Sequence, residues 1–152
     1  MPTITPFIWF DDNLEQATDF YVGLFPDAKL LDENRTPDGH LFYATFTLAG
    51  QTFYGLNGGP GHPQTDAFSI FVTCADQAEV DKYWDALTAD GTPVACGWLV
   101  DKFGLSWQIV PKLLLELIAE PDRAKAKRAA DAMLKMVKID IAGLEAAAGG
   151  RG

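Results

Sequence analysis

Few residues of this chain carry side chains that could do chemistry, and several of them lie close together in the second half. The segment "FGLSWQIVP" (103–111) has the pattern of a strand in which Gln108 interrupts an apolar run. Such an amide is either a hydrogen-bonded core group or a group that faces a ligand. Ser106 shares its side of the strand, because successive side chains point to opposite faces. Cys96 and Asp101 are further candidates for ligand binding.

The histidines and cysteines form no recognisable catalytic or metal pattern. His40 and His62 fall in predicted loops, where an exposed imidazole is the usual state. Cys74 and Cys96 lie in no CxxC motif, and no histidine at a definable spacing would activate Cys96. Two isolated thiols are typical of a reducing compartment. We therefore expect a cytoplasmic protein without a cofactor.

Length and charge exclude several classes of function. A chain of 152 residues forms one domain or two small subdomains, and no run approaches the roughly 20 apolar residues of a membrane span. The first residues show no secretory signal. Residues 1–111 carry a net charge of −11, which argues against nucleic acid as a partner. Residues 112–152 carry +2, so this tail is a solvated helix face or lies against an acidic body, its own or a partner's.

The two halves follow the same order of predicted elements, namely a strand, a helix and then about three strands. Asp12 and Glu15 have the spacing of a capping box at the first helix, and Asp76 and Glu79 repeat it at the second. When the two halves of the sequence are aligned on their hairpin glycines, Gln108 takes the same position as Tyr54. The sequence thus predicts an α+β fold of two tandem βαβββ modules in a single domain, residues 1–152. Module one is 3–57, a glycine- and proline-rich linker is 58–66, and module two is 67–111.

A helical extension, residues 112–147, follows the second module. Helices are predicted at 113–119 and 122–147. In the longer one an apolar residue recurs every three or four positions, and such a stripe must be buried on the body or on a second subunit. Its members are Ala126, Ala130, Met133, Val137, Ile141 and Leu144.

Several segments resemble the PhnB-like proteins, the group labelled "3-demethylubiquinone-9 3-methyltransferase". They are "ITPFIWFDDNLEQATDFYVGLFPDAKL", "LNGGP", "VDKYWDAL", "CGWLVDKFGLSWQIVP" and "AMLKMVKIDIAGLEAA". This group belongs to the vicinal oxygen chelate, or glyoxalase/bleomycin-resistance, superfamily. The resemblance implies βαβββ modules whose mixed sheets curl around a cleft, and it implies a homodimer.

The residues do not support the methyltransferase label. Transfer from S-adenosylmethionine usually rests on a doubly wound domain with a GxGxxG loop between a strand and a helix. This chain has no such loop. The run Gly58-Gly59-Pro60-Gly61 leads into a strand, and its prolines remove amide donors, so a linker is the better interpretation.

Metal-dependent members of the superfamily bind the ion at four corners, two from each module. By the resemblance these corners fall near Pro6, Tyr54, Ser69 and Gln108. None is a carboxylate or an imidazole, the donors that a divalent ion prefers, so we predict no metal. If Gln108 faces the cleft, Tyr54 and Ser69 should be near it and supply polar groups to a small-molecule pocket. The alternative is that they hydrogen-bond one another in a filled core.

The sequence therefore predicts a metal-free PhnB-like homodimer that binds a small organic molecule, without nucleic acid or membrane as a partner. Tyr54, Ser69, Gln108, Cys96 and Asp101 are its candidate ligand-binding residues. An enzyme is the alternative, either a metal-dependent protein of the glyoxalase or dioxygenase type or the methyltransferase of the label. A third class is a partner-binding domain that uses the C-terminal helices.

Overall fold

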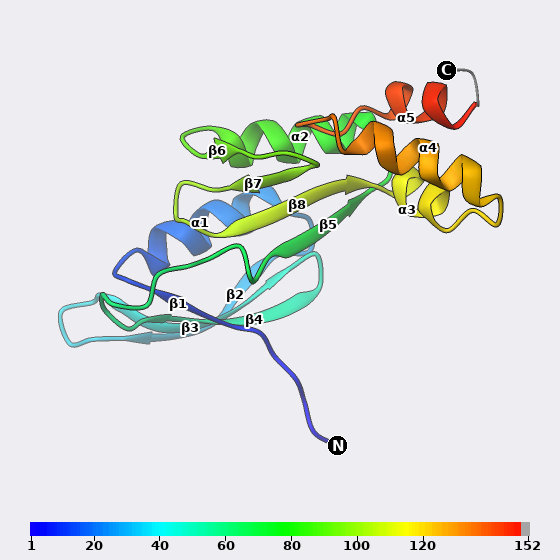
Figure 1. Ribbon diagram of the computed structural model, residues 1–152. Helices are drawn as coiled ribbons and strands as arrows, with labels where there is room; N and C mark the ends of the chain where they lie inside the picture. The colour runs from blue at the N-terminus through cyan, green and yellow to red at the C-terminus, as the bar shows by residue number, and fades with distance from the viewer. Residues whose placement is uncertain (150–152) are drawn as a thin grey trace. The chain divides into compact units, whose positions relative to one another are not determined.

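The computed structural model describes residues 1–149 (Figure 1). Contacts divide the chain into one compact unit from Met1 to Pro63 and another from Gln64 onward. The two units are described in turn.

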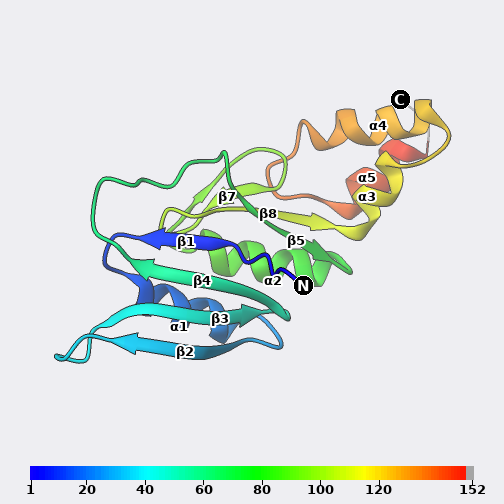
Figure 2. The same ribbon diagram turned by 90° about the horizontal axis from the view of Figure 1, so that it is seen from below.

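The first unit is a helix packed on a four-stranded mixed sheet. Its sheet has the order β1-β4-β3-β2, with β1 parallel to β4 and the other neighbours antiparallel (Figure 2). The elements are β1 (Phe7–Phe10), α1 (Leu14–Leu24), β2 (Lys29–Arg35), β3 (Leu41–Leu48) and β4 (Gln51–Asn57).

Helix α1 buries Leu14, Ala17 and Tyr21, which recur at the three- and four-residue spacing of one helical face. The predicted cap by Asp12 and Glu15 is wrong. Asn13 is the N-cap residue and makes no side-chain cap bond. The amide of Leu14 instead donates to Oδ1 of Asn57 at 2.9 Å, while Arg35 donates to Glu15 at 2.8 Å. Long-range partners thus replace the local cap.

The second unit begins with the same plan. Its sheet has the order β5-β8-β7-β6, with β5 parallel to β8. Here the predicted cap by Asp76 is confirmed, since Asp76 accepts from the Glu79 amide at 2.9 Å, while Glu79 reaches back to the amide of Ala75, one residue before the N-cap, at 3.0 Å. The elements are β5 (Ile70–Cys74), α2 (Gln77–Thr88), β6 (Thr92–Pro93), β7 (Trp98–Val100) and β8 (Ser106–Pro111).

The register of the strands confirms the internal repeat. Phe7 pairs with Tyr54 between β1 and β4, and Phe71 pairs with Gln108 between β5 and β8. Tyr54 and Gln108 therefore occupy matching places, as the sequence alignment predicted. The fold class is α+β with two βαβββ modules, each built on an open four-stranded sheet.

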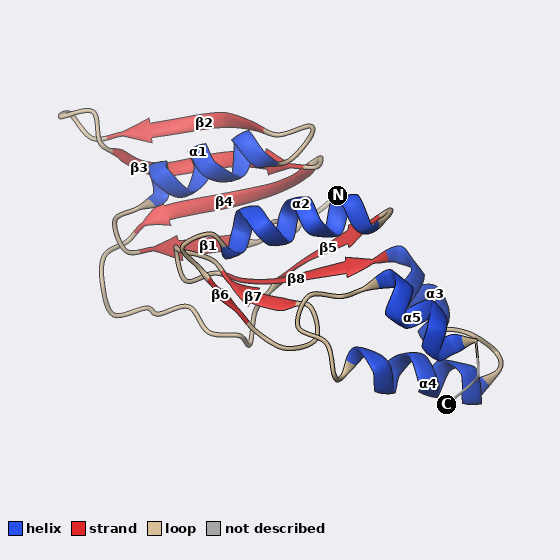
Figure 3. Cartoon of the chain, turned by 90° about the horizontal axis from the view of Figure 1, so that it is seen from above, coloured by secondary structure: helices blue, strands red, loops and turns tan. Residues whose placement is uncertain are grey.

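Three short helices complete the second unit (Figure 3). They are α3 (Lys112–Ile118), α4 (Arg123–Met133) and α5 (Ile141–Ala148), so the single helix predicted over 122–147 is wrong. The chain leaves the helix because the amides of Cys96 and Gly97 donate to the carbonyls of Met136 and Val137, each at 2.8 Å. Their core consists of Val110, Leu114, Leu117, Ala129, Ile139, Leu144 and Ala148.

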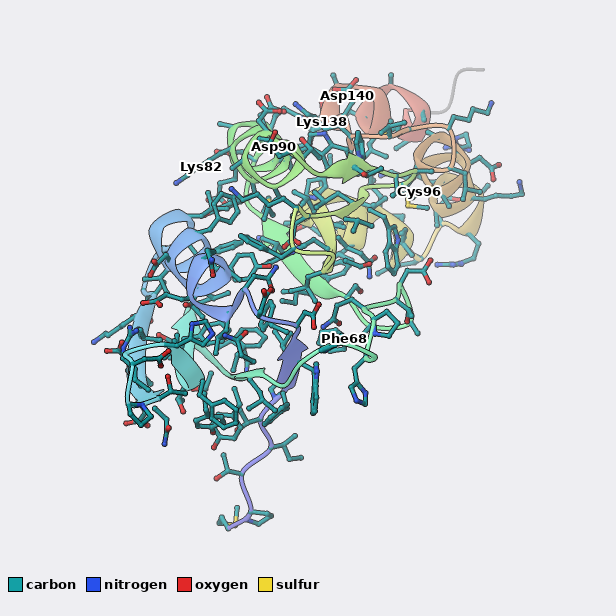
Figure 4. The ribbon with its side chains drawn as sticks, turned by 90° about the vertical axis from the view of Figure 1, so that its left-hand side faces the viewer. Phe68, Lys82, Asp90, Cys96, Lys138 and Asp140 are labelled. Atoms are coloured by element: carbon teal, nitrogen blue, oxygen red, sulfur yellow. The ribbon has the colours of Figure 1, made fainter. Side chains whose placement is uncertain are left out.

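Helix α2 holds the segment between α4 and α5. Gln77 donates to the Ile139 carbonyl at 3.1 Å and accepts from the Ile141 amide at 2.8 Å. Lys138 lies 3.2 Å from both Asp81 and Asp85 (Figure 4 labels Lys138). One basic residue of the tail thus lies against the acidic body of its own chain. Within residues 1–149, every helix is too short or too polar to cross a membrane.

Candidate functional site

The face of the second sheet that points away from α2 carries the polar residues. Helix α2 packs on β7 and β8, and on that side Leu99, Trp107 and Ile109 are fully buried. Strand alternation puts their neighbours on the opposite, open face. The register pairs Trp98 with Gln108 across the two strands, and it likewise pairs Val100 with Ser106.

A pocket of about 290 Å³ opens on this face. Strand residues form its floor, and the loop between β6 and β7 forms its wall. Apolar walls with a few polar groups are the usual composition of a small-molecule site. Lining residues include Asp66, Val94, Cys96, Trp98, Val100 and Ser106.

Two reactive groups line this pocket. The Cys96 thiol is free and its residue is half-buried. Ser106 is only 2% exposed, yet among the described residues its hydroxyl has no hydrogen-bond partner. Among residues 1–149, every fully buried side-chain oxygen has a hydrogen-bond partner. The unpartnered Ser106 hydroxyl must therefore reach solvent, and it does so in the pocket that Ser106 lines. A polar group held in this way is available to a ligand.

The structure brings Gln108 and Ser69 together. Nε2 of Gln108 donates to Oγ of Ser69 at 3.0 Å, and both side chains are half-buried. Gln108 lies opposite Trp98, so this pair shares the open face with the pocket. The Gln108 amide thus has a hydrogen-bond partner and also lies beside a cavity. It therefore combines the two alternatives for this residue, a hydrogen-bonded core group and a group that faces a ligand.

Asp101 has a structural place at the turn between β7 and β8. Only 3% exposed, its carboxylate accepts from the amides of Phe103 and Leu105 at 2.9 and 3.0 Å. It also accepts from the indole of Trp107 at 2.8 Å. Trp107 faces α2, so the carboxylate that binds its indole lies toward that side of the sheet. Asp101 is therefore apart from the pocket, which is on the opposite, open face.

Tyr54 belongs to the first unit and lies in an aromatic cluster on its sheet. The Tyr54 ring centroid is 6.4 Å from that of Phe7 and 5.8 Å from that of Tyr43. Its amide donates to the Pro6 carbonyl at 2.9 Å. The structure therefore places Tyr54 among aromatic rings of its own unit.

The donors at the four corners do not fit a divalent cation. Pro6 offers no side-chain ligand, Tyr54 packs among rings, and the amide nitrogen of Gln108 points at Ser69. Residues 1–149 contain no group of three His, Cys, Asp or Glu side chains that could hold an ion. His62 packs on Trp9 at 4.3 Å between ring centroids, and Nε2 of His40 lies 3.3 Å from the Asn57 amide.

The two thiols differ sharply. Cys74 is fully buried, and this burial, with added repulsion from Glu79 and Asp76, raises the pKa of its thiol to about 12. Cys96 lies instead in the pocket loop with a positive φ of 61° (Figure 4). Its exposure makes Cys96 the accessible thiol of the two.

Sequence reasoning missed much of the pocket wall. Asp66, Val94 and Val100 carry no pattern that marks them, because a two-residue strand and an irregular loop bring them together. The alternation of β8 did place Ser106 on the side of Gln108. Trp98 likewise carries no mark of its place and lies half-buried in the pocket.

Comparisons with known proteins agree with this geometry. The family described as 3-demethylubiquinone-9 3-methyltransferase matches residues 2–110. A Bacillus cereus protein described as a 3-demethylubiquinone-9 3-methyltransferase and PhnB protein is 32% identical, with a TM-score of 0.68 over 72% of this chain and 99% of that one. No match was found among curated proteins.

More distant structures share the fold alone. A Pseudomonas aeruginosa protein is 16% identical with a TM-score of 0.60, over 73% of this chain and 98% of its own. A fosfomycin resistance protein from Listeria monocytogenes is 18% identical with a TM-score of 0.53, over 70% and 88%. That structure contains Mn(II) and 1S,2S-dihydroxypropylphosphonic acid. The family match ends just before α3, so the C-terminal helices lie outside it.

Proposed function

Because this chain belongs to the 3-demethylubiquinone-9 3-methyltransferase family of PhnB-like vicinal oxygen chelate proteins, we propose that it uses their fold to bind a small organic molecule without a metal. The pocket on the open face of the second sheet carries this proposal. Its size and its mostly apolar walls suit a small, compact molecule. Ser106, a buried residue, supplies a hydroxyl that opens into the pocket, and Gln108 and Ser69 add polar groups on the same face.

Acetophenone, a neutral aromatic ketone, is a suitable probe for two-dimensional amide NMR. We expect saturable shifts of the Cys96, Trp98 and Ser106 amides. Val100→Phe fills the pocket and should weaken binding at least about tenfold, since a lost contact of about 1.4 kcal/mol has that effect. Leu31→Phe is the control, because Leu31 is 49% exposed, lies in β2 of the first unit and does not line the pocket. Shifts elsewhere, or equal binding by both variants, would contradict the proposal.

The metal-free part of the proposal rests on the donor set. Metal analysis of tag-free protein should find no stoichiometric ion, and zinc, nickel, manganese or EDTA should leave the melting temperature unchanged. A bound ion would favour the alternative of metal-dependent, glyoxalase-type or dioxygenase-type chemistry.

The family's description names a methyltransferase, and this second function has a direct test. Neither sheet is the parallel, doubly wound sheet on which S-adenosylmethionine is usually bound. We expect calorimetric titration with S-adenosylmethionine to show no heat of binding. Saturable binding would establish the cofactor and displace the present proposal.

The proposal includes a cytoplasmic homodimer acting as one domain. Both cysteines are free thiols, which suits a reducing compartment. Large apolar side chains of the C-terminal segment, Leu134 at 62% and Val137 at 51%, remain exposed and suit a second copy. Light scattering should give the mass of a dimer, and Leu134→Asp should shift it toward the monomer. If the Leu134→Asp variant keeps the mass of a dimer, this segment is not part of the interface.

A further inference from the structure

The pocket on the second sheet combines a thiol with an unpartnered hydroxyl. Cys96 contributes the sulfur from the wall, and Ser106 contributes the hydroxyl from the floor. The hydroxyl is the more telling group, because a residue that is 98% buried normally has its polar atom satisfied. A ligand with a hydrogen-bond acceptor would give the Ser106 hydroxyl a partner.

Backbone contacts fix the place of the thiol. The Cys96 and Gly97 amides bond to the carbonyls of Met136 and Val137, and the Gly97 carbonyl accepts from the Ile109 amide at 2.8 Å. A Cβ at Gly97 would lie 3.0 Å from the Ile109 carbonyl oxygen. The loop therefore has little freedom, and the sulfur is held at the pocket.

The other lining groups define the class of ligand. Val94, Trp98 and Val100 favour an apolar body. The Asp66 carboxylate repels anions, and the apolar walls disfavour the desolvation of a cation, so a neutral ligand suits the pocket. Ser106 donates to an acceptor such as a carbonyl oxygen. A carbonyl conjugated to a carbon–carbon double bond adds an electrophilic carbon that suits a thiol.

We propose that this pocket is a covalent binding site for small, neutral α,β-unsaturated carbonyl compounds, captured by Cys96 and oriented by Ser106. The proposal rests on the binding function assigned above and names its ligand class. The sulfur forms a bond to the β-carbon, and the π electrons of the double bond move to the carbonyl oxygen. The Ser106 hydroxyl donates to this enolate oxygen. The thiol proton passes through water to the α-carbon, so the adduct contains every atom of both reactants.

Cyclohex-2-en-1-one is the probe, with adduct formation followed by intact mass and peptide mass spectrometry. We expect one adduct at Cys96, a rate that saturates with probe concentration, and no adduct at buried Cys74. Ser106→Ala should slow the reaction about tenfold, because a hydrogen bond to a developing charge is lost. Iodoacetamide, which needs no carbonyl donor in the pocket, should modify Cys96 at the same rate in both proteins.

Thr88→Ala is the matched control, since it removes a hydroxyl that bonds only to its own helix at Trp84. This variant should react with the enone at the wild-type rate. The proposal is overturned by a rate that rises linearly without saturation, by equal slowing with both reagents in Ser106→Ala, or by no adduct at Cys96.

Cyclohexanone, the saturated analogue, separates this proposal from the binding function. It should compete with the enone and slow adduct formation while forming no adduct itself. If cyclohexanone shifts the pocket amides but the enone leaves Cys96 unmodified, covalent capture fails and binding stands. If neither compound shifts those amides, both proposals fail.

Discussion

Tyr54 in the first sheet packs among Phe7 and Tyr43, whereas Gln108, its match in the second sheet, bonds to Ser69 beside a pocket. The backbone register is the same in both places. One copy of the motif fills its open face with aromatic rings, and the other leaves room. The side chains, not the strand order, therefore decide whether a pocket opens on this face of the sheet.

Strand length explains how the room arises. In the first sheet β2 and β3 have seven and eight residues, but their counterparts β6 and β7 have two and three. The loop between β6 and β7 takes the place of regular strand and forms the pocket wall. Amides that a longer strand would pair are satisfied by Met136 and Val137 instead.

The largest expected effect concerns the two strand connections. The first sheet turns at Ala49 and Gly50, which have positive φ and donate to the backbone carbonyls of Pro26 and Asp27. The turn in the second sheet depends instead on the Asp101 carboxylate. Asp101→Ala should lower the free energy of unfolding by about 3 kcal/mol, because buried donors lose their acceptor. Urea unfolding measures this, with exposed Asp32→Ala as the control. A loss no larger than that of the control would contradict a structural role.

A somewhat smaller effect tests how each helix approaches its sheet. Gly55 in β4 has no room for a Cβ, which would lie 2.5 Å from Cδ1 of Leu14. Ile109 fills the matching place in β8. Gly55→Ala should cost about 1–3 kcal/mol through overpacking. In a double-mutant cycle, Leu14→Ala should offset part of that cost. Strict additivity would show that the two residues do not compete for space.

Gln77 gives an effect found only in the second unit. Gln77→Ala removes both hydrogen bonds to the segment before α5 and should cost about 1–2 kcal/mol. Hydrogen exchange at the Ile141 amide should accelerate more than exchange within β8. Gln51→Ala is the matched control, because that exposed amide bonds only to its neighbour Thr52. Equal acceleration of hydrogen exchange throughout the second unit would show that Gln77 does not stabilise this segment locally.

The smallest expected effect compares an exposed ion pair in each unit. Hydrogen bonds from Gln77 and Lys138 hold the pKa of Asp81 below its usual value, and Arg35 likewise lowers the pKa of Glu15. A lowered folded pKa stabilises the fold above the usual carboxyl range, and this contribution is lost as pH falls through the folded value. The melting temperatures of Asp81→Asn and Glu15→Gln should therefore lie slightly below that of the wild type at pH 7 and converge with it as the pH falls through the lowered pKa values of the two carboxyls. Differences that persist at low pH would have another cause.

The sequence could predict features that depend on local or repeated patterns. Asp76 and Glu79 cap the second helix through backbone amides close to them in the chain, whereas Glu15 of the first helix accepts from the distant Arg35 instead. The match of Tyr54 with Gln108 follows from the repeat and is confirmed by the register. The break between α4 and α5 could not be predicted, since it depends on bonds to Cys96 and Gly97 some forty residues earlier.

The bonds from Cys96 and Gly97 to Met136 and Val137 also have a consequence for biosynthesis. A growing chain emerges from the ribosome with its N-terminus first. The pocket wall therefore leaves the ribosome well before the carbonyls that hold it. Until the last helices follow, the loop lacks these partners and its amides bond to water. A chain truncated before Met136 and Val137 would therefore lack the backbone bonds that hold the wall of the proposed binding pocket.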